Sequence, residues 1–196
     1  MIQDSKKLSM GIARAIHGRS VPNNLRSLVA IGSFEVSLEH HRAVILTVAK
    51  QFFGSAFSLL RPMFESCIVG LWAAHIADES QIKEFNNRRY HPKPEKVLRA
   101  LAKNSEKRYV AALKAIHDSG YQALHEFVHG GISQLTRRTD GSNIGPHYPR
   151  EMIESLLHVL NVIAAISATQ LADLTQDGAA GKGLDVAIDR YFEKRA

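Results

Sequence analysis

Phe57-Ser-Leu-Leu-Arg-Pro-Met-Phe-Glu-Ser-Cys-Ile-Val-Gly-Leu-Trp-Ala-Ala-His-Ile76 is the most apolar stretch of the chain. A helix with this sequence carries apolar side chains on nearly every face, which is typical of a central, buried helix. Its polar exceptions are therefore informative. Arg61 and Glu65 are four residues apart and share one face. Pro62 either kinks this helix or marks its first turn.

Helical spacing of apolar residues continues on both sides of this segment. It predicts a helix from about 23 to 53, bent or divided at Gly32, and a long helix from 149 or 150 to 173. Ser119 and Gly120 are expected to stop one helix before another begins at Tyr121.

The whole chain is predicted to form one all-α domain, a single-domain helical bundle of six to eight helices. No alternating run of the kind that forms strands occurs. The bundle's core is expected over about 23–175, followed by a flexible connector over 178–183 and a C-terminal helix over 184–195. The two larger loops are expected at 88–94 and 139–149.

Composition and charge restrict the class of protein. The 196 residues include 25 Lys and Arg against 19 Asp and Glu, and this charge of +6 mildly indicates RNA or another polyanion as a partner. The single cysteine, Cys67, excludes an internal disulfide and fits a reducing compartment. Polar residues interrupt the longest apolar stretch, 156–174, so we expect no membrane contact and a cytoplasmic location.

His125-Glu126-Phe127-Val128-His129 matches the H-E-x-x-H pattern of zinc peptidases. On a helix the two histidines lie one turn apart as possible metal ligands, with Glu126 as a general base. The pattern makes a zinc metallohydrolase a minor alternative. If any metal binds, His125 and His129 are the expected ligands.

The third ligand that a zinc peptidase needs is not in the usual place. Residue 135, where one class has a histidine, is a leucine, although Glu151 or Glu154 could supply a carboxylate from a following helix. No strand is expected beside the motif to hold a substrate peptide. The common phosphate-binding glycine loops are absent as well, and we expect no cofactor.

Three groups of short strings resemble a family of uncharacterised bacterial all-helical proteins over about residues 35–175. They are Arg61-Pro-Met-Phe-Glu65 with Gly70-Leu-Trp72, His129-Gly-Gly131 with Gln134-Leu-Thr-Arg-Arg138, and Ile144-Gly-Pro-His-Tyr-Pro149. That family is loosely similar to HEPN-type helical bundles, some of which are metal-independent ribonucleases of toxin or defence systems. The resemblance implies a HEPN-like fold and a homodimer.

The same resemblance implies a catalytic arginine followed by a histidine with four to six residues between them, and no arginine of this chain has that spacing. A site assembled from separate helices remains as the candidate, with Arg61, Glu65, His129 and Arg137 as its residues. The alternative is that these polar groups hold the helices together without chemistry. The first hypothesis is thus a nucleic-acid-associated or defence-linked protein, and the second is a non-catalytic ligand-binding or protein-interaction bundle.

Overall fold

The computed structural model describes residues 1–104, 108–175 and 178–193, and over these residues it contains nine helices and no strand. The predicted all-α fold is therefore confirmed. One helix more than expected is present because residues 132–135 form a single turn. The helices are α1 (Ile2–Ile16), α2 (Leu25–Ala49), α3 (Phe53–His75), α4 (Glu79–Asn86), α5 (Pro94–Asn104), α6 (Arg108–Val128), α7 (Ile132–Leu135), α8 (Arg150–Thr175) and α9 (Gly178–Phe192).

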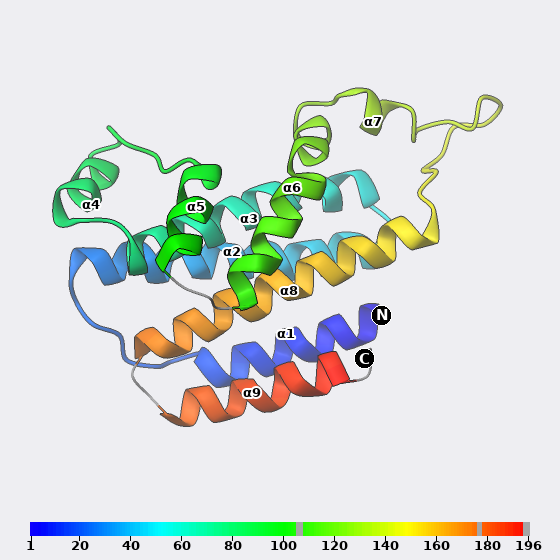
Figure 1. The fold of residues 1–196 in the computed structure, drawn as a ribbon. Helices are drawn as coiled ribbons and strands as arrows, with labels where there is room; N and C mark the ends of the chain where they lie inside the picture. Colours follow the sequence, from blue (N-terminus) through cyan, green and yellow to red (C-terminus); the bar gives the residue numbers. More distant parts are fainter. Residues whose placement is uncertain (105–107, 176–177, 194–196) are drawn as a thin grey trace.

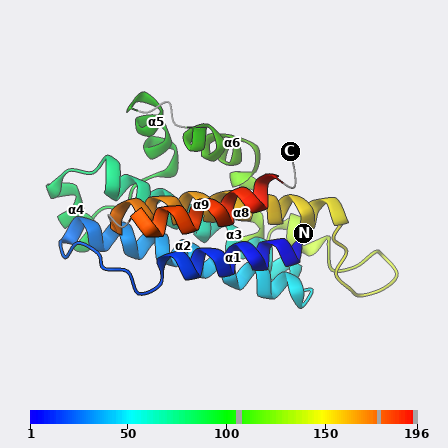
Figure 2. The same ribbon diagram turned by 90° about the horizontal axis from the view of Figure 1, so that it is seen from below.

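The helices are arranged around α3 and α8 (Figures 1 and 2). Helices α2 and α3 pack along each other, and α8 lies against both. On one side of this layer, α1 and α9 run antiparallel, in contact with each other and with α8. On the other side lie α4, α5 and α6, while α7 and the loop up to residue 149 project from one end.

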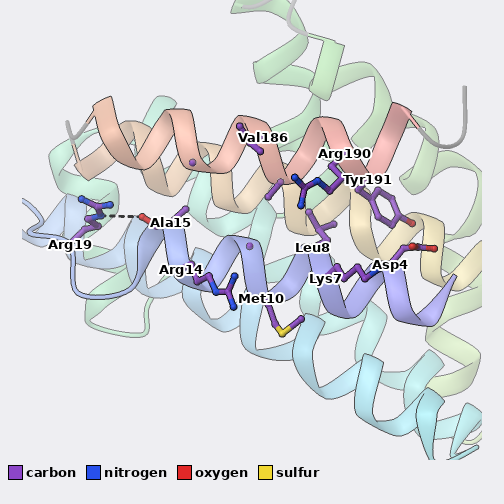
Figure 3. A pocket seen from close by; sticks show the side chains of 13 residues that line it. Asp4, Lys7, Leu8, Met10, Arg14, Ala15, Arg19, Val186, Arg190 and Tyr191 are labelled. Carbon is purple, nitrogen blue, oxygen red and sulfur yellow. Dashed lines mark hydrogen bonds between the residues drawn. The ribbon is translucent and has the colours of Figure 1, made fainter.

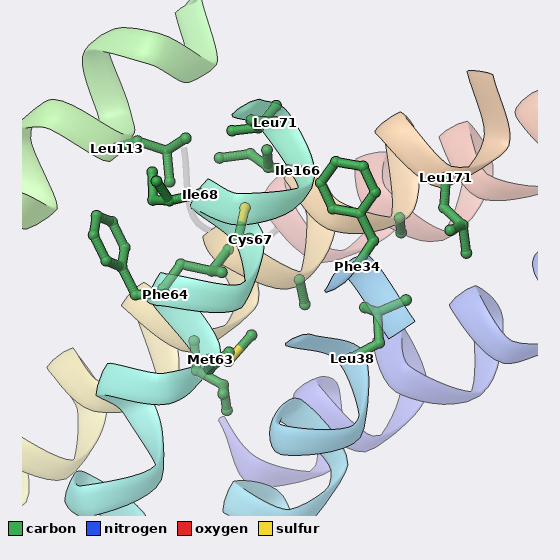
Figure 4. Packing of buried hydrophobic residues seen from close by; sticks show 14 of the residues in the cluster. Phe34, Leu38, Met63, Phe64, Cys67, Ile68, Leu71, Leu113, Ile166 and Leu171 are labelled. Carbon is green, nitrogen blue, oxygen red and sulfur yellow. The ribbon is translucent and has the colours of Figure 1, made fainter. Parts of the chain in front are cut away.

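Helix α3 is the centre of the core, as its sequence predicts. Figure 4 shows its apolar side chains between those of α2, α6 and α8. Phe64, Cys67 and Leu71 have no exposed surface. A Cβ atom on Gly70 would lie 2.5 Å from the Phe34 ring, so the glycine is what allows α2 to approach α3 closely. Each fully buried large apolar side chain stabilises the fold by about 1.5–3 kcal/mol.

Two residues that could have interrupted helices lie inside them. Gly32 lies inside α2, which continues unbroken to Ala49. Pro62 lies well inside α3, so it does not mark a first turn. Because proline has no amide hydrogen, it removes one intrahelical hydrogen bond, and the burial of α3 outweighs that loss.

Two further predictions about helix boundaries are wrong. Helix α6 runs through Ser119 and Gly120 without a stop. Helix α9 begins at Gly178, so residues 178–183 form its first turns in place of a flexible connector. The predicted end of that helix at 194–195 lies outside the described residues.

A polar network is buried where α1, α2, α8 and α9 meet. The His41 imidazole, 1% exposed, lies with Nε2 2.9 Å from Oδ1 of Asn161. The Asn161 amide nitrogen donates to the hydroxyls of Ser5 and Tyr191, each at 2.7 Å. Burial lowers the pKa of His41 from 6.5 to about 4; nearby Arg42 lowers it further, while the Asn161 bond opposes the shift. His41 is therefore neutral, and its Nε2 donates to Asn161.

Helix α8 is long and apolar enough to cross a membrane by length and composition alone. More than half of its most apolar window is buried against other helices of the bundle. The cytoplasmic location stays a prediction.

Candidate functional site

Four polar side chains meet where α3 crosses α6. Arg61 and Glu65 lie one turn apart on α3, and Tyr121 and His125 lie one turn apart on α6. Arg61 Nε donates to Glu65 Oε1 at 2.9 Å, and Arg61 Nη2 donates to the Tyr121 hydroxyl at 3.4 Å. Arg61 Nη1 contacts His125 Nδ1. We call these four residues the Arg61 cluster.

The guanidinium group of Arg61 is the centre of the cluster. Each of its three nitrogens contacts a different residue of the cluster, and the Tyr121 ring centroid lies 4.9 Å from its Cζ atom. Burial opposes a charge here, but the hydrogen bond to Glu65 and the charges nearby raise the pKa of Arg61. The guanidinium is thus a permanent cation that three neighbouring side chains hold in place.

Tyr121 completes the cluster by donating its hydroxyl hydrogen to Glu65 Oε1. Burial, together with this bond to a carboxylate, raises the pKa of Tyr121 to about 12. A phenol in this state is a poor proton donor to a reaction at neutral pH. The Arg61 cluster therefore holds α3 to α6, and its polar groups interact with each other.

The two histidines of the H-E-x-x-H motif are close, with ring centroids 4.3 Å apart. Arginine has no acceptor, so Nδ1 of His125 accepts from Arg61 in this contact and carries no hydrogen of its own. A zinc-binding imidazole needs the opposite arrangement, in which the nitrogen away from the metal donates.

The rest of the motif does not form a zinc site either. Within the described part of the chain, no three His, Cys, Asp or Glu side chains gather as a metal site would require. The Glu126 carboxylate lies against the backbone of Gly131, where a Cβ atom would be 2.2 Å from Glu126 Oε2. The donors present therefore do not fit a catalytic zinc ion.

The four residues predicted as the site are only partly brought together. Arg61 and Glu65 form the cluster, and His129 is exposed beside His125 at its edge. Arg137 lies elsewhere: it donates to the carbonyl of Ser133, and its guanidinium lies 5.9 Å from the Phe127 ring centroid. No contact joins Arg137 to the cluster among the described residues.

Sequence reasoning missed Tyr121 and assigned His125 only as a possible metal ligand. The missing signal was a stripe, because His117, Tyr121 and His125 recur every four residues and so share one face of α6. His129 follows at the same spacing, just after the helix ends at Val128. His117 stacks on Tyr121 with ring centroids 5.0 Å apart. The predicted break at Gly120 divided this stripe between two helices.

A second candidate site is a concentration of positive charge. Residues 88–114 contain nine Lys and Arg and two Glu, a net charge of +7, so the remainder of the chain has a net charge of −1. We use the name basic surface for the six exposed cations of the α4–α5 loop and α5: Arg88, Arg89, Lys93, Lys96, Arg99 and Lys103. None of the six pairs with a carboxylate within the part of the chain that the structure describes.

Aromatic side chains lie next to the basic surface. Tyr90, 38% exposed, lies 5.5 Å from Trp72 between ring centroids, and His91 stacks on Phe85 at 5.9 Å. An open groove of about 620 Å³ runs past Tyr90 and His91, with Arg88 and Arg89 on its wall. Cations beside a partly exposed aromatic ring are a pattern that suits single-stranded nucleic acid.

Comparison with solved structures and with curated proteins found no match. A model of a family of unknown function (DUF6988) matches residues 34–194, most of the chain. The matched range includes the Arg61 cluster and the basic surface, whereas α1 precedes it. The chain therefore belongs to this family of unknown function.

Proposed function

We propose that the protein binds single-stranded nucleic acid, such as RNA, through the basic surface and without cleaving it. The observation that carries this proposal is the charge distribution, because the net charge of residues 88–114 is +7 and that of the rest of the chain is −1. Unpaired surface cations in such number favour a phosphate backbone by releasing its bound counterions.

The geometry of α5 supports this function. Lys96, Arg99 and Lys103 follow each other at helical spacing, so they form a stripe along one side of the helix. The opposite side is buried, with Val97 and Leu98 in the core. A rigid helix held to the bundle in this way presents its cations at fixed spacing to a polymer of phosphates.

The loop before α5 adds a means of contacting bases. Tyr90 is held by Trp72 on one side and is partly exposed. Stacking of a base on an aromatic ring contributes about 1–3 kcal/mol and does not depend on which base it is. We expect binding that is strong at low salt and tolerant of sequence.

The contacts of the Arg61 cluster support binding without cleavage. A nuclease needs a base, an acid or a cation with free capacity at the phosphodiester. Arg61 and Tyr121 are instead occupied by Glu65 and His125. These groups therefore support the fold, and chemistry on RNA is not expected.

The test is fluorescence anisotropy with a labelled single-stranded RNA and the triple variant Lys96→Gln/Arg99→Gln/Lys103→Gln. We expect the Kd at low salt to rise by about tenfold or more. The control triple variant Lys50→Gln/Arg150→Gln/Lys182→Gln removes the same charge from exposed positions elsewhere and should bind as the wild type does. Equal loss in both variants would show that only net charge matters and would contradict the proposal.

We propose as a second candidate function that the projecting end of the molecule contacts another protein, for which a second copy of the chain is the simplest partner. Apolar side chains are unusually exposed there, and Ile144 is 97% exposed. Scattered apolar residues need no explanation, but several on one projecting segment indicate an interface. They are Val128, Ile132, Leu135 and Ile144.

Sedimentation analysis of the variant Ile132→Asp/Leu135→Asp tests this second function. A dimeric wild type should become monomeric in this variant, whereas Leu46→Asp, at an equally exposed position on α2, should leave the dimer intact. A monomeric wild type at high concentration would exclude the second copy as the partner.

A further inference from the structure

A groove between α1 and α9 is separate from both proposed sites. It encloses about 500 Å³, which lies within the range of small-molecule sites. Figure 3 shows the two helices side by side with side chains of both along the gap. We call it the α1/α9 groove. Its α1 wall precedes the residues that the family model matches.

The base of the groove is apolar and preformed. The helices are in close contact at Gly11, where a Cβ atom would lie 2.6 Å from Cβ of Ala187. Leu8 forms part of the floor and is buried, while Met10 and Val186 on the walls are 53% and 59% exposed. Tyr191, buried at one end, is fixed by the hydrogen bond from Asn161. Exposed apolar side chains over such a floor are available to cover an apolar chain.

The rim of the groove is cationic. Lys7 and Arg14 line it from α1 and Arg190 from α9 (Figure 3), and all three are exposed. Among the described residues none of these three cations has an ion pair or a hydrogen bond through its side chain. Asp4 also lines the groove, and its carboxylate lies 3.4 Å from the N-terminal ammonium of Met1. The rim therefore has positive charge available for an anion.

We propose that the α1/α9 groove binds a free single-chain amphiphile with an anionic head, of the fatty-acid type. Its apolar tail would lie over Leu8 and Val186, and its carboxylate would interact with an arginine of the rim, Arg14 or Arg190. Charge-assisted hydrogen bonds from arginine suit a carboxylate. This proposal is independent of nucleic-acid binding, because it uses another face of the molecule.

Two other occupants fit less well. A second copy of the chain, paired by a two-fold axis, would bring the rim cations against their own counterparts, and like charges in an interface are unfavourable. A partner helix would need a row of apolar anchors over two or more turns. The exposed apolar side chains of this groove are few, so a small ligand fits its extent better.

Isothermal titration with sodium dodecanoate below its micellar concentration tests the proposal. We expect one saturable site in the wild type. The variant Val186→Glu places a carboxylate on the apolar wall, and Arg14→Gln/Arg190→Gln removes two rim cations. Each should weaken binding by about tenfold. Lys182→Gln, an exposed position on the same helix outside the groove, is the matched control and should bind as the wild type does.

Four results would overturn the proposal. The first is equal affinity for dodecanol, since the head group must be anionic. The second is an equal loss of affinity in Lys182→Gln. The third is a dimer that Val186→Glu dissociates while dodecanoate does not bind, which would assign the groove to a second copy. The fourth is binding to anionic lipid vesicles without saturable binding of dodecanoate, which would assign it to a membrane surface. Circular dichroism of each variant checks that the fold is retained.

Discussion

Gln51 and Arg88 are the two non-glycine residues in the left-handed region of the backbone among those described, with φ of 63° and 59°. Each is the second residue after the end of a helix, α2 or α4, and allows the chain to reverse there. The amide of Phe52 donates to the carbonyl of Thr47 at 2.8 Å, and that of Arg89 to Glu84 at 2.9 Å. Glycine is the usual residue at such a position because a Cβ atom is disfavoured there.

These two positions allow strain to be separated from function. Both Arg88→Gly and Gln51→Gly should stabilise the protein by about 0.5–1 kcal/mol, because the strain is relieved in each. Only Arg88→Gly should weaken RNA binding, since Arg88 belongs to the basic surface and Gln51 lies at the end of α2. Urea unfolding and fluorescence anisotropy measure the two effects. Unchanged RNA affinity in Arg88→Gly would remove this arginine from the interface.

His41 makes the stability of the protein depend on pH. Its pKa is lowered by burial to about 4, so between pH 6.5 and 4 the unfolded chain binds a proton that the folded chain does not. Stability is therefore complete above pH 6.5 and is lost as the pH falls through this window, by about 3 kcal/mol in all. About 2 kcal/mol of that loss is expected by pH 5.

Urea unfolding at pH 7 and pH 5 checks this prediction. The variant His41→Gln, which can still donate to Asn161 but does not titrate, should lose about 2 kcal/mol less than the wild type between the two pH values. His158→Gln, at an exposed position on α8, should retain the full pH dependence. Equal pH dependence in all three proteins would mean that His41 is not the titrating group.

At the scale of elements, the Arg61 cluster connects the central helix to α6. Its Arg61–Glu65 pair has the same spacing and the same 2.9 Å distance as the Arg150–Glu154 pair at the start of α8. The surroundings differ: the Arg61 side chain is 21% exposed and that of Arg150 is 85% exposed. An exposed pair contributes little, whereas a half-buried one with further hydrogen bonds contributes more.

We expect Arg61→Met to destabilise the protein by about 1–3 kcal/mol and Arg150→Met by less than about 0.5 kcal/mol. The larger value arises because Glu65, Tyr121 and His125 all lose a partner in the first variant. Urea unfolding measures both. RNA affinity should be unchanged in Arg61→Met once the protein is folded, and a large loss of affinity with little change in stability would instead place Arg61 in a binding site.

The sequence predicted those parts of the fold that depend on burial along a single helix. The apolar stretch 57–76 identified the central helix, and its spacing placed Arg61 beside Glu65. The predicted stop at Gly120 was wrong because a helical glycine costs only about 1 kcal/mol, and burial of side chains such as Leu113 and Phe127 on either side of it outweighs that cost.

The partners of Arg61 could not be predicted, because they depend on which helix packs across α3. Tyr121 and His125 are 60 and 64 residues away along the chain, and spacing within a segment contains no information on such a contact. The same reason explains Arg137, which was grouped with the site from neighbouring strings but lies over Phe127. Local pattern determines which side chains share a face, and packing determines what that face meets.

At the scale of the whole molecule, the net charge of +6 conceals an uneven distribution. The net charge of the whole chain mildly indicates a polyanionic partner. A net charge of +7 is concentrated in residues 88–114, which are one continuous part of the chain. In Figure 1 the loop after α4 and helix α5 lie on one side of α8, and α1 and α9 lie on the other. The α1/α9 groove and the basic surface are thus separate, and a variant in one should not affect the other.

The salt dependence of RNA binding gives the last test of the basic surface, because it reports how many phosphates the protein neutralises. If the cations of α5 neutralise phosphates, the logarithm of the RNA association constant should fall linearly with the logarithm of salt concentration. Replacing one contacting cation, as in Lys96→Gln, should reduce the magnitude of that slope by about one. Lys182→Gln removes an equal charge from α9 and should leave the slope unchanged. A slope that falls equally in both variants would mean that the RNA is attracted by the general field of the protein, and α5 would then have no specific part in binding.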